Sequence, residues 1–283
     1  TGNSNTAATQ LVRTADITAP TVALTSTSPT TTNAPFLVTA TFSENVTGFI
    51  ASDVNLTNST ISNFTGSGTT YTFTVTPNAS GAVTVNVPAA QATDIAGNNN
   101  TAATQLTRTA DITAPTANLA AISNITTAGG TSQTLTITFS DSNGVDVSSL
   151  DNSDVVINWS GGAIPATFIS ATPIGNGTPR TATYSFIPPG GTWDNADNGT
   201  YTVNLQASQV RDTVGNLSAA SSLGTFGVNI PAPVTTPTPV TTPTPVTTPT
   251  PVTTPTPVTT PTPVTTPTPV TTPTPVTTPT PVT

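Results

Sequence analysis

The sequence contains no cysteine, histidine, methionine or lysine, and only four arginines. Without histidine or cysteine, the chain cannot carry a Ser-His-Asp or Cys-His catalytic system, an ordinary zinc or haem site, or a disulfide framework. Its net charge of −8 argues against nucleic acid or an anionic membrane surface as a partner. No apolar run approaches the roughly 18 residues of a membrane span, and no signal-peptide pattern is present.

Charged residues and, over most of the chain, proline are also scarce. Charged residues make up 6% of the sequence, against about 25% in an average protein. Of the 29 prolines, 18 lie in the last 53 residues, so this stretch is built differently from the rest. The preceding residues are enough for two cores of roughly 100 residues each.

A long internal repeat opens the chain. Residues 1–20 (TGNSNTAATQLVRTADITAP) and 96–115 (AGNNNTAATQLTRTADITAP) match at 17 of 20 positions, with an offset of 95 residues. This spacing is too long for a solenoid repeat and suits a small sandwich domain. We therefore expect one domain over residues 16–111 and a second, diverged domain over 112–230. Residues 1–15 would be the terminal strand of a preceding repeat or a donor strand.

Both units show short runs in which apolar and polar residues alternate, which is typical of β-strands. The runs at 36–42 and 71–75 in the first unit, and at 135–139 and 201–205 in the second, are clear examples. Glycine-rich clusters separate the runs and mark turns. We count about seven short strands per unit and no amphipathic helix, as in an Ig-type sandwich. The predicted fold is all-β, with tandem Ig-like β-sandwiches.

The end of the chain, residues 231–283, is a repetitive segment in which Val-Thr-Thr-Pro-Thr-Pro recurs eight times. Proline removes amide donors and pushes the preceding residue into an extended conformation, so we expect a polyproline-II-like stalk without a core. One interpretation is a semi-rigid spacer. The other is an O-glycosylated stalk, because this composition is typical of such stalks. The candidate glycosylation sites are Thr235, Thr236, Thr238, Thr241, Thr242, Thr244, Thr247, Thr248 and Thr250.

Several stretches of both units resemble a known family. Residues 34–58, 69–77 (TTYTFTVTP) and 82–98 (with VTVNVPAAQATDIAGN) resemble the bacterial Ig-like repeats of large secreted surface proteins and adhesins. The segments ITTAGGTSQTLTITFSD and GTWDNADNGTYTVNLQASQVRDTVGN of the second unit resemble related modules of bacterial, notably cyanobacterial, surface proteins. The resemblance implies a secreted or cell-surface spacer, adhesive unit or fibre element. It implies neither a ligand nor catalytic residues.

Three acidic residues are expected to meet at one pole of each sandwich. They lie at the start of the first strand, after the second strand and between the last two strands. Close carboxylates without a lysine repel one another unless a cation neutralises them, and calcium prefers such oxygen ligands. One interpretation is therefore a calcium site that stiffens the junction with the preceding domain, and the other is that these residues only set turns. The candidates are Asp16, Glu44 and Asp94 in the first unit, and Asp111, Asp141 and Asp212 in the second.

Further oxygen donors are available for such a site. Asn98, Asn143 and Asn216 lie near the predicted poles and could add side-chain oxygens. In the first unit, Asp53 could complete the coordination shell or simply begin a strand.

The opening segment raises a separate question. Residues 6–14 match the last strand of the first unit, but no sandwich precedes them in this sequence. The chain could be a slice of a longer repeat array. Alternatively, the segment could add a strand to a sandwich of a neighbouring copy and so build a surface filament. The donor-strand candidates are Thr6, Gln10, Leu11 and Val12.

Together these features predict an extracellular structural or adhesive protein that is not an enzyme. Its partners would be other copies of itself, or a surface glycan or protein, with covalent glycans on the stalk. One alternative is a carbohydrate-binding module joined to a secreted hydrolase, which needs exposed aromatic rings, with Trp159 and Trp193 as candidates. A further alternative is a calcium-stiffened spacer array of an adhesin. Glycosidase chemistry needs paired acids in a cleft with aromatic side chains, and aromatic residues make up only 5% of the chain.

Overall fold

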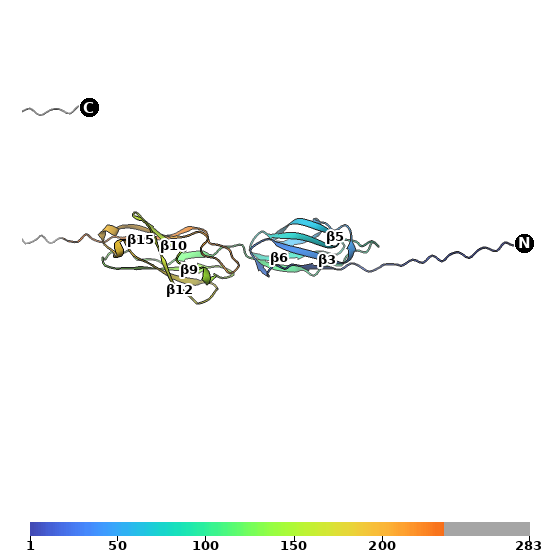
Figure 1. Ribbon diagram of the computed structural model, residues 1–283, viewed down its shortest axis with the longest axis horizontal. Coiled ribbons are helices and arrows are strands. Elements are labelled where there is room, and N and C mark those ends of the chain that lie inside the picture. Colours follow the sequence, from blue (N-terminus) through green and yellow to red (C-terminus); the bar gives the residue numbers. More distant parts are fainter. Residues whose placement is uncertain (235–283) are drawn as a thin grey trace, which may run out of the picture. The chain divides into compact units, whose positions relative to one another are not determined.

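A computed structural model describes residues 1–234 of the chain (Figure 1). The predicted stalk threonines, Thr235 onward, lie outside these described residues. The described part contains fifteen strands and four short 3-10 turns, which confirms the all-β prediction for that part. Within it, no helix has the length and apolar character needed to cross a membrane.

The first sandwich, sandwich 1, is formed by two sheets with strand orders β1-β3-β5 and β2-β7-β6-β4. Phe36, Val38, Ala40 and Phe42 alternate along β3 and are all buried, as the period-two pattern predicted. A tight turn within β5 requires Gly66, because a Cβ there would collide with the backbone of Thr70. The strands are β1 (Val22–Thr25), β2 (Thr31–Thr32), β3 (Phe36–Val46), β4 (Asn55–Thr57), β5 (Ser59–Pro77), β6 (Gly81–Asn86) and β7 (Leu106–Ala110).

The second sandwich, sandwich 2, has sheets with strand orders β11-β10-β14-β15 and β12-β13-β9-β8. Its core is a separate hydrophobic cluster that includes the fully buried Leu135, Ile137, Tyr184 and Tyr201. The strands are β8 (Thr116–Leu119), β9 (Gln133–Ser140), β10 (Val155–Trp159), β11 (Gly162–Pro165), β12 (Thr167–Thr172), β13 (Arg180–Phe186), β14 (Gly199–Leu205) and β15 (Ser221–Val228).

Sandwich 2 has eight strands where we expected about seven, because one edge segment divides between the two sheets. Its first half, β11, pairs with β10 in one sheet, and its second half, β12, pairs with β13 in the other. Pro165 ends β11 and has no amide hydrogen with which to continue a ladder. The chain therefore changes sheets at this point.

The first strand of each sandwich also changes sheets. In sandwich 1, β1 pairs antiparallel with β3, and β2 then pairs in parallel with β7 in the other sheet. The amide of Thr109 donates to the Thr30 carbonyl at 2.8 Å, and the amide of Asp111 donates to the Thr32 carbonyl at 2.9 Å. In sandwich 2, Ile125 forms the corresponding parallel bridge with Val228.

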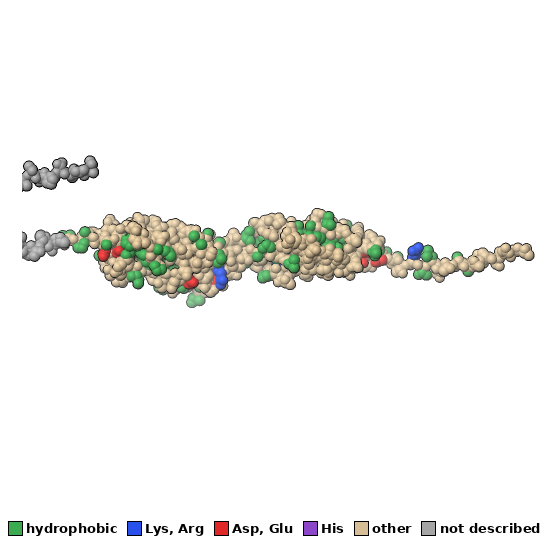
Figure 2. Space-filling view, turned by 45° about the horizontal axis from the view of Figure 1, so that its top comes forward, with side chains coloured by type: hydrophobic (Ala, Val, Ile, Leu, Met, Phe, Trp, Pro, Cys, Tyr) green, Lys and Arg blue, Asp and Glu red, His purple; other side chains and the backbone are tan. Residues whose placement is uncertain are grey.

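The surface carries few charges. In Figure 2 most atoms on the visible face belong to uncharged polar side chains or backbone, with isolated acidic and basic groups. Within residues 1–234, one ion pair is formed, between Arg211 Nε and Asp146 Oδ2 at 2.9 Å. Side-chain contacts on this surface are therefore mostly hydrogen bonds of Thr, Ser and Asn, and not ion pairs.

Candidate metal centres

The acids predicted at the pole of sandwich 1 do come together. One carboxylate oxygen from each of Asp16, Glu44 and Asp94 lies within 4.8 Å of the other two. Asp16 precedes β1, Glu44 lies near the end of β3, and Asp94 lies in the loop between β6 and β7. The sandwich topology thus joins three segments that are distant in sequence.

Sandwich 2 repeats this arrangement. Single carboxylate oxygens of Asp111, Asp141 and Asp212 also lie within 4.8 Å of one another. Asp111 follows β7, Asp141 follows β9, and Asp212 lies between β14 and β15. The residues occupy the same topological positions as in sandwich 1, although the second unit has diverged in sequence.

An asparagine fixes the loop acid of each cluster by the same set of hydrogen bonds. In sandwich 1, the Asn98 amide and side-chain Nδ2 donate to the two oxygens of Asp94, both at 2.8 Å. In sandwich 2, the Asn216 amide and Nδ2 donate to Asp212 at 2.9 and 2.6 Å. Each asparagine also donates to the backbone carbonyl of the acid in the linker before its sandwich, which is Asp16 in the linker 16–20 and Asp111 in the linker 111–115.

These contacts change the role that the sequence suggested for the asparagines. Asn98 and Asn216 direct their side-chain Nδ2 at the acids and donate hydrogen bonds to them. Asn143 likewise donates from Nδ2 to Asp111 Oδ2 at 2.6 Å. Asp53 lies outside the cluster, where its Oδ2 accepts from the Ile50 amide at 2.8 Å.

One acid in each cluster has a raised pKa. Burial raises the pKa of Glu44, and repulsion from the other two acids of its cluster adds to this. Burial also raises the pKa of Asp141, again with repulsion from its two neighbours, although backbone hydrogen bonds act in the opposite direction. By contrast, the hydrogen bond from the Asn98 side chain lowers the pKa of Asp94.

The donor sets fit calcium. Ca²⁺ prefers hard oxygen ligands at roughly 2.3–2.6 Å, so two ligands on opposite sides of one ion lie about 5 Å apart. The three oxygens of each cluster, within 4.8 Å of one another, could therefore bind the same ion. A cation there would also relieve the repulsion that raises the pKa of Glu44 and Asp141.

Asp111 makes contacts on both sides of the linker. Its Oδ1 accepts hydrogen bonds from Ser80 Oγ at 3.3 Å and Thr113 Oγ1 at 2.7 Å, and its Oδ2 accepts from Asn143. Burial raises its pKa, but the hydrogen bonds from Thr113, Asn143 and Ser80 outweigh burial and lower the pKa overall. Ser80 belongs to the turn between β5 and β6, and no sequence motif connected this residue with the acids.

The donor-strand candidates lie in a segment without regular structure. Thr6, Gln10, Leu11 and Val12 are exposed, with Leu11 at 74% and Val12 at 77% of full exposure. The repeat of this segment in sandwich 1 forms β7, which pairs with β6 and β2. Sandwich 2 also contains its own last strand, β15, paired with β14. Neither described sandwich therefore lacks the strand that this segment could supply.

The two tryptophans belong to the aromatic cluster of sandwich 2. Trp193 is 3% exposed, and Trp159 is partly buried and stacks on Tyr201 with ring centroids 5.5 Å apart. Among the described residues, every aromatic side chain is buried or partly buried. The flat array of exposed rings that a carbohydrate-binding module needs is absent from this part of the chain.

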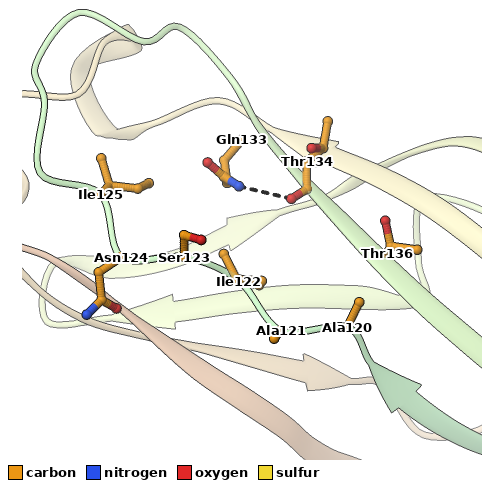
Figure 3. Close-up of a pocket in the computed structure, with 9 residues that line it drawn as sticks. All are labelled: Ala120, Ala121, Ile122, Ser123, Asn124, Ile125, Gln133, Thr134 and Thr136. Atoms are coloured by element: carbon orange, nitrogen blue, oxygen red, sulfur yellow. Dashed lines mark hydrogen bonds between the residues drawn. The ribbon is translucent and has the colours of Figure 1, made fainter.

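A groove of about 420 Å³ lies beside β9, where the chain leaves β8 and crosses to the other sheet (Figure 3). Gln133 Nε2 donates to the carbonyl of Thr134 at 3.0 Å, on the wall opposite Ile122 and Ser123. The lining side chains are small, aliphatic or uncharged, so the groove offers no acid, base or nucleophile pair. The lining residues are Ala120, Ala121, Ile122, Ser123, Asn124, Ile125, Gln133, Thr134 and Thr136.

Residues 16–110, which form sandwich 1, match the bacterial Ig-like domain family. No curated protein matches the chain significantly.

Among solved structures, the chain is similar to the Dpr2 Ig1-Ig2 structure in complex with DIP-Theta Ig1-Ig3 (11% identity, 76% of this chain and 100% of that chain, TM-score 0.24). It is also similar to the N-terminal part of the bacterial S-layer protein SbsC (15% identity, 75% and 44%, TM-score 0.24). A third similar structure is the Yersinia pseudotuberculosis adhesin InvE (15% identity, 73% and 58%, TM-score 0.23). The last two matches span less than two thirds of those chains, and likenesses this weak carry no functional argument.

Proposed function

We propose that the chain is a non-catalytic, extracellular structural or adhesive protein, a rod or fibre unit of tandem Ig-like domains with an O-glycosylated Thr/Pro stalk. The observation that carries this proposal is the match of sandwich 1 to the bacterial Ig-like domain family. The repeated linker at residues 16–20 and 111–115 supports it, because a recurring domain joined by a recurring linker is how spacer arrays are built.

The surface chemistry also supports an extracellular role. Sulfur-containing side chains are absent, so the chain offers oxidants neither a thiol nor a thioether. Proteases that cut after lysine or arginine find only four such positions in 283 residues. Both features suit a protein exposed outside the cell for long periods.

The stalk part of the proposal predicts a specific mass. Mass spectrometry of native material should show regular sugar increments above the mass of the bare sequence. Peptide mapping should place the excess on residues 231–283, while peptides from 112–230 keep their bare mass as an internal control. A bare mass for the stalk peptides would contradict glycosylation and leave the stalk as a plain spacer, without affecting the Ig-like role.

A second candidate function is a calcium-stiffened spacer, and the repeated acid clusters favour it. The same three topological positions carry carboxylates in both sandwiches, and the same asparagine contacts orient them. In each case one acid, Asp16 or Asp111, lies in the linker that precedes the sandwich. An ion bound there would tie the linker to the sandwich and restrict the hinge.

Calcium is therefore expected to raise the melting temperature of both sandwiches. Saturating Ca²⁺, at about 100 times the dissociation constant, adds about 2.7 kcal/mol, which for a domain of about 100 residues is a shift on the order of 10 °C. Differential scanning calorimetry with Ca²⁺ and with EDTA would measure it. Glu44→Gln should remove the response of sandwich 1, and Asp141→Asn that of sandwich 2.

Glu44 is the cleanest position for this test, because its side chain accepts no hydrogen bond from the described residues that a glutamine would break. Asp194→Asn, which changes an exposed acid outside both clusters, serves as the control and should keep the full response. Equal melting temperatures in Ca²⁺ and EDTA would rule out the calcium proposal and leave turn formation as the role of the clusters.

A further inference from the structure

Sandwich 2 contains a buried acid that belongs to neither cluster. Asp154 is 0% exposed and ends the loop that leads into β10. Its Oδ2 accepts a short hydrogen bond of 2.6 Å from the Tyr184 hydroxyl and one of 2.8 Å from the Asp151 amide. Its Oδ1 is buried and has no hydrogen-bond partner among the described residues. A carboxylate would leave negative charge on this unpartnered oxygen.

Within residues 1–234, no positively charged group compensates the charge of Asp154. The titratable groups that face Asp154 are Tyr184, from β13, and Asp151, from its own loop, and both are acids. From the end of β14, only the neutral amide of Gln206 reaches it, donating to the Asp154 backbone carbonyl at 2.8 Å. An unpaired buried charge is costly, whereas a neutral carboxylic acid loses far less on burial.

Burial accordingly raises the pKa of Asp154 from 3.8 to about 6, although the hydrogen bonds from Tyr184 and Asp151 lower it. Burial likewise raises the pKa of Tyr184, and the charge of Asp154 raises it further, so the phenol stays protonated. The proton that titrates near neutral pH therefore belongs to the carboxyl group.

We propose that Asp154 and Tyr184 form a pH-sensitive lock, which holds the loop before β10 on the core while Asp154 is protonated and weakens sandwich 2 when the proton is lost. This loop makes contacts with both the core and an edge strand. It contributes the buried Leu150 to the core. Its Asn152 Oδ1 accepts from the Phe168 amide of β12 at 2.7 Å. Release of the loop would therefore also free part of an edge strand.

The direction of the effect follows from the raised pKa. The folded state holds the Asp154 proton more tightly than the unfolded chain, so the stabilisation is fully present below the unfolded pKa of 3.8 and is lost as pH rises through about 6. A difference of about two pKa units corresponds to roughly a hundredfold in the folding equilibrium constant. Asp154 should thus contribute more to the stability of sandwich 2 at pH 4 than at pH 7.

Sandwich 1 lacks the lock and provides a comparison within the same chain. The two sandwiches can be aligned on their cluster acids, Glu44 and Asp141. Val38 lies six positions before Glu44 and pairs with Phe73. Leu135 lies six positions before Asp141 and pairs with Tyr184. The residue equivalent to Tyr184 is therefore a phenylalanine without a hydroxyl. Asp53 ends the corresponding loop but is only partly buried.

The test uses the full chain, because both tryptophans, Trp159 and Trp193, lie in sandwich 2 and report its unfolding alone. Urea unfolding followed by tryptophan fluorescence should give a folding constant that falls about fiftyfold from pH 4 to pH 7 relative to Asp154→Asn. The asparagine variant keeps a neutral side chain at every pH. The ratio of the wild-type to the variant folding constant therefore reports the titration of Asp154 and cancels that of Asp141, which is present in both proteins. The control Asp53→Asn should behave like the wild type. A wild-type to variant ratio that does not change with pH would overturn the proposal.

A second measurement keeps the proposal testable if Asp154→Asn does not fold. Carbon-detected NMR titration of the wild-type aspartate carboxyls would follow Asp154 directly. A midpoint near 6 supports the lock, and a midpoint at or below the ordinary aspartate value contradicts it. Tyr184→Phe, which introduces the residue found in sandwich 1, removes the bond that favours the charged form and should move the midpoint to higher pH.

Discussion

Replacing Asp212 with alanine should lower the free energy of unfolding of sandwich 2 by about 3–5 kcal/mol, because it leaves several loop amides without partners. Asp212 is 1% exposed, and its Oδ1 accepts from the amides of Val214, Gly215 and Asn216 at 2.8, 2.6 and 2.9 Å. Its Oδ2 accepts from the Asn216 side chain. Alanine removes all four bonds at once. Urea unfolding followed by tryptophan fluorescence in EDTA would measure the loss without any contribution from calcium.

The same measurement has a matched control in the first sandwich. Asp94 holds its loop by equivalent contacts with Asn98 but lies in a sandwich without tryptophan. Asp94→Ala should therefore leave the fluorescence transition of sandwich 2 in place. A loss below about 1 kcal/mol for Asp212→Ala would show that water replaces the carboxylate and that the loop does not depend on it.

Tyr201→Ala should cost about 3–5 kcal/mol of unfolding free energy, the range for removing a large buried aromatic side chain. Tyr201 is fully buried, stacks between Trp159 and Phe226 with centroids 5.5 and 5.2 Å away, and meets the edge of Trp193 at 5.3 Å. Its removal leaves a cavity between the rings of Trp159, Trp193 and Phe226. A shift of the calorimetric transition of sandwich 2 to lower temperature would report the loss.

The milder variant Tyr201→Phe separates packing from hydrogen bonding. It keeps the ring and loses one bond, from the hydroxyl to the Asp197 carbonyl at 3.0 Å. The expected cost is about 1 kcal/mol. If the phenylalanine and alanine variants were equally destabilised, the hydrogen bond and not the packing would hold this part of the core.

Much of the fold was predictable because burial in a two-sheet sandwich imposes a period of two. The alternation along β3 and β9 is by itself enough to assign the inward residues of Phe36–Phe42 and Leu135–Phe139 to the core. The acid clusters were predictable for a related reason, since sandwich topology fixes which strand ends share a pole. The repeat then pointed to the same positions twice.

Contacts that depend on side-chain direction and depth were not predictable in this way. From the sequence alone, Asp154 is indistinguishable from any loop aspartate, and Tyr184 is one inward-facing residue of an alternating strand. Only the folded chain shows that the hydroxyl meets the carboxylate. Ser80 reaches Asp111 from 31 positions away, and nothing local to either residue predicts this contact. Pro165 marks the end of β11, but only the folded chain shows that β12 then pairs with β13 in the other sheet.

The parallel pairing of β2 with β7 bears on how sandwich 1 responds to tension. The chain enters the sandwich through β1, continues into β2 and leaves at the end of β7. In a parallel pair, the start of β2 and the end of β7 lie at opposite ends, so this pair carries the load once β1 has detached from β3. Pulling on the two ends of the sandwich therefore slides the strands lengthwise past each other. The bonds from Thr109 to Thr30 and from Asp111 to Thr32 share the load and must break together, whereas an antiparallel pair pulled from one end would unzip bond by bond. We therefore expect this short parallel pair to resist stretching, and forced unfolding would measure that resistance as a rate and not as an equilibrium stability.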